Sequence, residues 1–244
     1  MGTRSAYNWR KTGRMAYWDD ATFETFRADY PVGFFDDFIG SDVVIPATGS
    51  VESGCKWSKK ITANATVAKT GDSINGLLAC SLTSASEAQE GALQMNDELM
   101  FSIAQGAIFE ARLSLTTLPT LNGVASFGLH GAYAAGGSNF RVGFEVPAGG
   151  LCACESDDDS TDTSASSGET LVAGTYYIFR IDCTTQTNIK FFIDGARVAG
   201  STTFSNAASA SDSKCQPHFG VYKASGAGLG VMSVDYVRVW QDRS

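Results

Sequence analysis

Three segments in the last third of the 244-residue chain constrain its fold most. Residues 176–182, 188–198 and 231–240 are rich in β-branched and aromatic residues, as strands are. Within the second segment, Asp194-Gly195 stands between apolar residues, and this pair tolerates the positive φ angles of a tight hairpin turn. The chain therefore predicts antiparallel β-structure near its C-terminal end.

The composition extends this prediction to the whole chain. Hydrophobic residues make up 43% and charged residues only 18%, with 26 glycines and 15 phenylalanines. No long apolar segment has a helical period, which favours many short strands joined by turns. The length fits one large domain with a substantial core, so we expect a single all-β sandwich.

The chain shows no sign of membrane insertion or secretion. No apolar run approaches the roughly 18 residues that a membrane helix needs. Residues 1–10 lack the apolar centre of a signal peptide. We expect a soluble protein that is made in a cytoplasm and does not contact a membrane.

Further strands and turns can be placed along the chain. We expect Asn75-Gly76 to form another hairpin turn. Three segments of polar or small residues, 87–97, 154–168 and 205–213, are predicted to be surface loops. In the closing strand, Val234, Tyr236 and Trp240 should face away from Val237 and Val239. The other predicted strands cover residues 33–39, 57–60, 66–69, 77–82, 99–103, 108–115, 125–131, 139–146 and 218–222.

The C-terminal segments, the aromatic-Asp-Asp-Phe string at residues 35–38 and the Phe-Glu-Ala-Arg string at 109–112 together resemble a known family. They resemble the concanavalin A-like lectin/glucanase jelly rolls, which include legume lectins, laminin G modules and laminarinase-type glycoside hydrolases. The resemblance implies an antiparallel β-sandwich (jelly roll) that serves as a sugar-binding or surface-display scaffold. It does not choose among these functions, because one fold hosts many.

The N-terminal segment differs in charge from the rest. Its basic residues and aromatic residues suit docking into a protein surface better than binding nucleic acid. We therefore divide the chain into an N-terminal anchoring arm, residues 1–32, and a jelly-roll domain, residues 33–244. The arm is expected to be extended, with a short helix that Asp20 could cap. The expected partner-binding residues are Arg4, Trp9, Arg10, Lys11, Arg14, Tyr17 and Trp18.

Six cysteines would allow disulfides, but a cytoplasmic place of synthesis predicts reduced and mostly buried thiols. Cys152 and Cys154 should share one face of a strand. Neither histidine has zinc-site spacing, so we expect no structural zinc.

Hydrolysis would need paired carboxylates. The resemblance to glucanases implies Glu-x-Asp-x-Glu or Glu-x-Asp-x-x-Glu, with a nucleophile and an acid on one strand face. Neither string occurs. Glu110 stands alone beside Arg112, where a surface ion pair is expected. We therefore predict a protein that is not an enzyme, because no strand is expected to present two acidic groups on one face.

A sugar site needs an aromatic platform and a few polar groups. His130, Tyr133, Asn139 and Arg141 surround a glycine-rich loop and are the candidate carbohydrate-binding residues, the alternative being an ordinary loop between strands. For Ca²⁺, which legume-type lectins position with Asp and Asn, the candidates are Asp157, Asp159 and Asp162. The alternative for these three is a solvated acidic loop, and no other cofactor is expected.

These observations favour a component of a bacteriophage virion, and residues 17–38 resemble phage structural proteins. We expect a non-enzymatic capsid decoration or cement protein, docked on capsid or other virion proteins through its arm, with a trimer as one possible homo-oligomer. The alternatives are a carbohydrate-binding adhesin of a tail or baseplate, which would bind host-surface glycans, and a divergent glycoside hydrolase.

Overall fold

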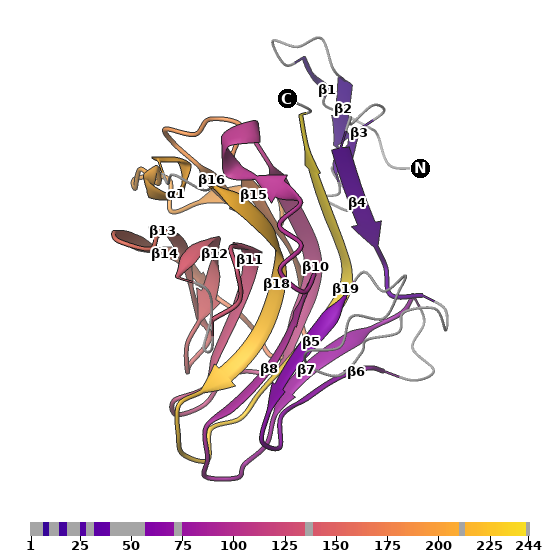
Figure 1. Ribbon diagram of the computed structural model, residues 1–244, viewed down its shortest axis with the longest axis vertical. Helices are drawn as coiled ribbons and strands as arrows, with labels where there is room; N and C mark the ends of the chain where they lie inside the picture. Colours follow the sequence, from indigo (N-terminus) through magenta and orange to yellow (C-terminus); the bar gives the residue numbers. More distant parts are fainter. Residues whose placement is uncertain are drawn as a thin grey trace.

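The computed structural model describes residues 7–9, 15–18, 25–27, 32–39, 57–70, 75–134, 139–209 and 213–242. Two antiparallel eight-stranded sheets pack face to face, which confirms the predicted jelly-roll sandwich (Figure 1). The first sheet runs β17–β16–β15–β10–β19–β7–β6, with β4 also paired to β19. The second runs β14–β13–β12–β11–β18–β8–β5, with β9 also paired to β18.

The strands of the first sheet are β4 (Val32–Asp36), β6 (Thr66–Lys69), β7 (Leu78–Leu82), β10 (Ile108–Thr117), β15 (Tyr176–Asp182), β16 (Lys190–Ile193), β17 (Ala196–Val198) and β19 (Gly230–Gln241). Those of the second are β5 (Ser58–Thr62), β8 (Gln89–Gln94), β9 (Phe101–Ser102), β11 (Val124–His130), β12 (Phe140–Val146), β13 (Leu151–Asp158), β14 (Asp162–Thr170) and β18 (Lys214–Lys223). A 3₁₀ turn, η1 (Ile103–Gln105), and a short helix, α1 (Asn206–Ser209), complete the sandwich.

The predicted hairpin turns have the backbone that their sequences favour. Asp194 and Gly195 have φ angles of 47° and 77° and join β16 to β17. Asn75 and Gly76, between β6 and β7, have φ angles of 72° and 70°. Positive φ at both positions matches the right-handed twist of the paired strands.

An aromatic layer holds the two sheets together. Phe127 and Phe144 of the second sheet meet Phe179 of the first at ring-centroid distances of 4.7 Å and 5.0 Å. Phe109 and Phe219 form a second contact between the sheets at 5.8 Å. All five rings are fully buried, so each strand that supplies one must turn its alternate residues outward.

In the closing strand β19, the predicted orientation of Val234 is wrong. Val234 lies in the core with Val237 and Val239, not on the outer face with Tyr236. The register of β19 against β10 shifts between Val234 and Tyr236, so the intervening Asp235 forms a β-bulge. One extra residue reverses the alternation, which a pattern of period two cannot anticipate.

Two predicted loops are strands. Residues 87–97 contain β8, which is buried along its whole length in the second sheet. Residues 154–168 belong largely to the hairpin of β13 and β14, and β14 is the edge strand, with alternating exposure. The third predicted loop, 205–213, contains helix α1. Glycine, glutamine and serine concealed the two strands because they weaken the apolar alternation.

The described cysteines are free and buried, as expected; Cys55 lies outside the described residues. Cys152 and Cys154 share the core side of β13. Burial raises the pKa of the Cys80 and Cys152 thiols to about 12, so these thiols stay protonated and unreactive near neutral pH.

The N-terminal segment is described only in part. A separate sheet has the order β1 (Tyr7–Trp9), β2 (Met15–Trp18) and β3 (Thr25–Arg27). The short helix expected after Asp20 does not include Thr25–Arg27, because these residues form strand β3. Of the expected anchor residues, Trp9, Tyr17 and Trp18 lie in β1 and β2, whereas Arg4, Arg10, Lys11 and Arg14 lie outside the described residues. Within the described part of the chain, no helix is long and apolar enough to span a membrane.

The outer face of the first sheet carries a row of charged and aromatic residues across six strands. In the middle lies Glu110, directly opposite Arg180 on one side and Arg238 on the other. Glu110 is fully buried, and its Oε1 lies 3.4 Å from Arg238 Nε and accepts a hydrogen bond from Tyr236 at 3.3 Å. The expected surface ion pair with Arg112 is therefore wrong, because Arg112 pairs with Asp235.

Aromatic rings farther out in this row stack on the two arginines that flank Glu110. The guanidinium of Arg180 lies 4.1 Å from the ring centroid of Phe192, and that of Arg238 lies 5.6 Å from Phe35. Stacking on these rings keeps the two arginines over the sheet, where they shield Glu110 from water.

Replacing Glu110 by Gln should destabilise the fold. The substitution keeps the shape of the side chain but removes its negative charge. Arg180 and Arg238, which are poorly solvated, then lose the anion that lies between them. We expect the free energy of unfolding to fall by about 3 kcal/mol. Urea denaturation followed by tryptophan fluorescence measures it, with exposed Glu98→Gln as the matched control. Equal free energies of unfolding for the two variants would show that the charge of Glu110 does not stabilise the fold.

Candidate functional site

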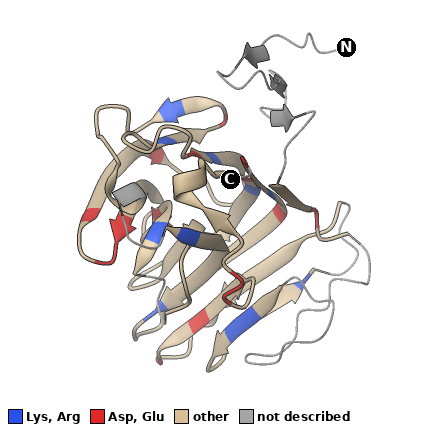
Figure 2. Cartoon of the chain, turned by 45° about the horizontal axis from the view of Figure 1, so that its top comes forward, with Lys and Arg blue, Asp and Glu red and all other residues tan. Residues whose placement is uncertain are grey.

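The outer face of the second sheet gathers many of the buried polar side chains outside that row. We call it the polar face: the residues of β5, β8, β18, β11, β12 and β13 that alternate with the core positions. Its central members Ser58, Gln94, His130, Gln216 and His218 are each at most 4% exposed. Most of both sheets is uncharged, with isolated charged segments (Figure 2).

Two stacked histidines form the centre of the polar face. The rings of His130 on β11 and His218 on β18 lie 4.2 Å apart and are tilted by only 10°. Glycines give them room: a Cβ on Gly143 would lie 3.3 Å from His130 Nε2, and one on Gly220 would lie 2.9 Å from His218 Nε2. Any larger residue at either position would displace a ring.

Both imidazoles are held neutral. Burial lowers the pKa of His218 to about 4 and that of His130 well below its ordinary value, with the neighbouring His218 and Arg141 adding to the effect on His130. Neither ring nitrogen of His130 has a hydrogen-bond partner in the part of the chain that the structure describes. Two neighbouring groups of the polar face, Ser58 Oγ and Gln94 Nε2, also have no hydrogen-bond partner among the described residues.

An acidic cluster surrounds Arg141 at one side of the polar face. Arg141 Nε donates to Glu155 Oε2 at 2.6 Å, and Arg141 lies opposite Asp157 in the β12–β13 ladder. Glu145, two residues beyond Gly143 on β12, is the diagonal neighbour of Glu155. Burial raises the pKa of Glu145, Glu155 and Asp157, and the charge of Arg141 opposes this in each case.

The opposite side carries Tyr133 and Glu90. Tyr133 Oη donates to Glu90 Oε2 at 2.7 Å, and Lys60 Nζ lies 5.2 Å from the Tyr133 ring centroid. The Tyr133 amide donates to Asp97 Oδ1 at 2.8 Å. These contacts hold the Tyr133 side chain against β8.

A buried amide supports this side. Gln216 Oε1 accepts the amide protons of Met95 and Asp97, and Gln216 Nε2 donates to Asp97 Oδ1 and the Gly131 carbonyl. Gln216 thereby joins the end of β8 to the end of β11. The Gln216 amide oxygen and nitrogen both have partners, whereas Gln94 Nε2 has none in the described segments.

The predicted sugar residues are brought together only in part. His130 and Arg141 lie directly opposite each other on β11 and β12. Tyr133 lies farther off, over β8, where it contacts Glu90, and Asn139 is exposed just before β12. Five further residues of the polar face were not predicted from the sequence. His218, Tyr222 and Gln94 come from distant segments, whereas Glu145 and Glu155 lie on β12 and the adjacent β13.

The predicted calcium ligands lie at the turn of the β13–β14 hairpin. Asp157 is opposite Asp162, and Asp157 Oδ1 accepts the amide proton of Asp159 at 2.9 Å. In the described ranges, no group of three His, Cys, Asp or Glu side chains is placed to hold a metal ion. The carboxylates act here as turn-forming groups.

Contrary to expectation, β13 presents two acidic side chains on one face. Glu155 and Asp157 occupy alternate positions of β13 and point to the same face, so one strand does present two acidic groups. The Glu155-Ser156-Asp157 string lies in residues 154–168, which the sequence predicts to be a surface loop and not a strand.

The chain is similar in sequence to one protein family and in fold to several solved structures. The profile of the family "SO2946-like, C-terminal domain" matches residues 81–235. The crystal structure of SO2946, a protein of unknown function from Shewanella oneidensis MR-1, superposes with a TM-score of 0.59 at 14% identity, covering 91% of this chain and 90% of that one. Comparison with curated proteins finds no match.

Two glycosidase structures have the same fold. A β-1,3-glucanase from Mycobacterium marinum superposes with a TM-score of 0.55 at 19% identity, covering 87% of this chain and 99% of that one. A glycosyl hydrolase family protein from Mycobacterium fortuitum superposes with a TM-score of 0.53 at 17% identity, covering 87% and 100%. At these identities the likeness establishes the concanavalin A-like fold and nothing about activity.

Stability should fall in acid because of the stacked histidines. Their folded-state pKa values lie below the ordinary value near 6.5, so below about pH 6.5 the unfolded chain binds more protons than the folded one. Each histidine then contributes a slope of about 1.4 kcal/mol per pH unit, which for His218 ends near pH 4.

His218→Gln should reduce this slope by one histidine's share between pH 6.5 and 4.5, as measured by urea unfolding at a series of pH values. Comparing the variant with the wild type cancels the contribution of the carboxylates. An unchanged slope would mean that His218 is already protonated in the folded protein.

Proposed function

The chain belongs to the SO2946-like C-terminal domain family, and from that premise we propose that its polar face binds carbohydrate. The observation that carries this proposal is a line of buried groups, Ser58 Oγ, Gln94 Nε2 and the His130 ring nitrogens, that have no hydrogen-bond partner among the described residues. Ser58 lies directly opposite Gln94, Gln94 lies one residue beyond the β8–β18 ladder beside His218, and His218 stacks on His130. These three side chains thus form part of one contiguous cluster.

Buried polar atoms without partners are rare in folded proteins and call for a ligand or bound water. The three side chains include a hydroxyl, an amide donor and a neutral imidazole, so the missing partner must supply both donors and acceptors. Sugar hydroxyls do both. The glucanase likeness supports this choice through the fold, and the acidic residues around Arg141 supply further acceptors at the margin.

Gln94→Met provides a sharp test because it separates binding from folding. The substitution removes an amide donor that has no partner among the described residues, so the free energy of unfolding should stay the same or rise. Affinity for an oligosaccharide should fall about three- to tenfold, the loss expected for one hydrogen bond.

The ligand for this test is chosen from an array of neutral, amino and acidic oligosaccharides, and affinities are then measured by isothermal titration calorimetry. Exposed Gln186→Met is the matched control and should bind as the wild type does. Binding of no glycan by the wild type, or unchanged affinity in Gln94→Met, would contradict the proposal.

Hydrolysis of the bound glycan is a second candidate, favoured by the pair Glu145 and Glu155. Both carboxyls have a raised pKa, and they flank Gly143 as diagonal neighbours on adjacent strands. Diagonal neighbours on a sheet lie about 7–8 Å apart at Cα, and hydrolytic carboxyl pairs are about 5–9.5 Å apart. One group could act as acid while Arg141 keeps the other ionised.

Under this second candidate, Glu145→Gln should lower the release of reducing ends from β-1,3-glucan at least about 100-fold while leaving binding intact. Because burial raises the pKa of the Glu145 carboxyl, wild-type activity should decline only on the alkaline side of the ordinary glutamate range. Glu169→Gln, an exposed substitution on β14, serves as control. Equal rates in all three proteins, or no release at all, would leave binding as the function.

The capsid-decoration role expected from the sequence remains a prediction. The relatives named above include no virion protein, and the expected basic anchors Arg4, Arg10, Lys11 and Arg14 lie outside the described residues. The adhesin alternative is the one that agrees with the proposed sugar-binding face.

A further inference from the structure

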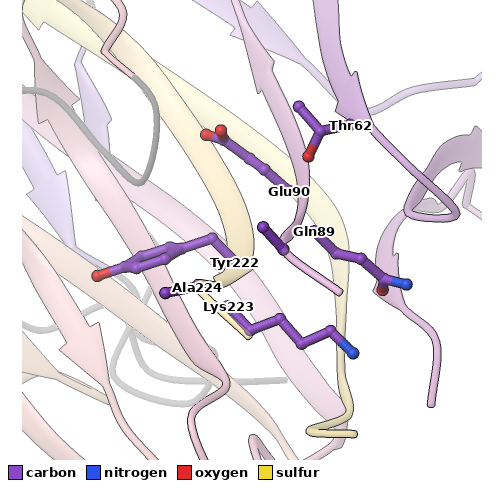
Figure 3. Close-up of a pocket in the computed structure, with 7 residues that line it drawn as sticks. Thr62, Gln89, Glu90, Tyr222, Lys223 and Ala224 are labelled. Atoms are coloured by element: carbon purple, nitrogen blue, oxygen red, sulfur yellow. The ribbon is translucent and has the colours of Figure 1, made fainter. Parts of the chain in front are cut away.

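An open pocket of about 340 Å³ lies where β5, β8 and β18 meet at one end of the polar face (Figure 3). It is lined by Thr62, Ala88, Gln89, Glu90, Tyr222, Lys223 and Ala224. This volume is near the lower end of the range of roughly 300–1,000 Å³ for small-ligand sites. The pocket therefore suits a small cyclic molecule better than a protein segment.

Four polar side chains of the lining already have partners. Glu90 Oε2 accepts a hydrogen bond from Tyr133 Oη at 2.7 Å, and Tyr222 is hydrogen-bonded to Glu145.

Lys223 and Gln89 are bound to neighbouring loop groups. Lys223 Nζ donates to the carbonyls of Thr83, Ala85 and Gly228 at 2.6–3.0 Å, so its aliphatic stem is what the pocket receives. The Gln89 amide accepts from the Thr83 amide and donates to Thr83 Oγ1 and Glu87 Oε1. These bonds fix two sides of the pocket before any ligand arrives.

The remaining walls combine one aromatic ring with hydroxyl and carboxylate groups. Tyr222 lies opposite Glu90, and Glu90 lies opposite Thr62, so the three form one row across the polar face. Burial raises the pKa of Tyr222 to about 12, and it therefore keeps its phenol proton at neutral pH. An aromatic face beside hydrogen-bonding groups is the combination that a sugar ring needs.

The charge of the pocket restricts which sugar can enter. Glu90 is 5% exposed and contributes a carboxylate, and the ammonium of Lys223 is turned toward the loop carbonyls. An acidic sugar would bring a second anion beside Glu90 in a poorly solvated site, where like charges repel strongly. A hydroxyl or ammonium group would instead form a charge-assisted hydrogen bond with Glu90.

We propose that this pocket is a subsite for a single neutral or amino-bearing hexose residue, and that it excludes uronic acids. The inference rests on the proposed carbohydrate-binding function of the polar face and deepens it. The subsite accepts the residue that extends beyond the histidine pair, at the accessible end of the polar face.

The test uses NMR titration of the full chain with glucose, glucosamine and glucuronate, and with their galacto counterparts. Neutral and amino sugars should shift the resonances of residues around Tyr222, and the uronates should bind at least about tenfold more weakly. Ala224→Trp, at an exposed position, should fill the pocket and weaken monosaccharide binding at least about tenfold. Exposed Ala173→Trp, outside the lining, is the matched control.

Glu90→Gln keeps the shape of the pocket and should bring uronate and hexose affinities within about threefold of each other. Uronates that bind the wild type as tightly as hexoses, or an Ala224→Trp variant that binds monosaccharides normally, would overturn the inference. Oligosaccharide binding that is sensitive to Gln94→Met but not to Ala224→Trp would overturn the subsite alone. A wild type that binds no sugar would defeat the proposed function as well.

Discussion

The aromatic layer between the two sheets fixes the position of the other side chains. Because Phe127 and Phe144 must reach Phe179 across the sandwich, the register of β11 and β12 cannot slip by one residue. The alternate residues of these strands are then committed to the opposite face, and among them are His130, Arg141 and Glu145. The geometry of the polar face is thus a consequence of core packing.

The sequence predicted those parts of the fold where alternation and turn chemistry agree. Strands 66–69 and 176–182 and the Asp194-Gly195 turn were found with their correct limits. β8 could not be found in the same way, because both of its faces are buried and its glutamines are identified as interior residues only by neighbours far along the chain. Gln94, for example, lies opposite Ser58 of β5 and beside the β18 strand that carries His218.

The candidate site was predictable to a similar extent. His130 and Arg141 could be paired because a short loop joins their strands, and they do lie opposite each other. His218, nearly ninety positions later, reaches His130 only through the pairing of β11 with β18. The acidic cluster was hidden because Glu155 and Asp157 stand in a segment of serines and aspartates that has no apolar alternation of its own. Such contacts follow from topology, which local pattern does not encode.

The outer strands of both sheets show how an open sandwich of this width avoids recruiting further strands. β17 at one edge has only three residues, and β6 at the other ends in Lys69. In the second sheet, β5 carries Lys59 and Lys60, and β14 begins with Asp162 and has no large apolar residue. Short or charged edges are unattractive templates for a neighbouring chain. Concentrated solutions of the protein should accordingly resist fibril formation, even though sixteen of its described strands lie in two eight-stranded sheets.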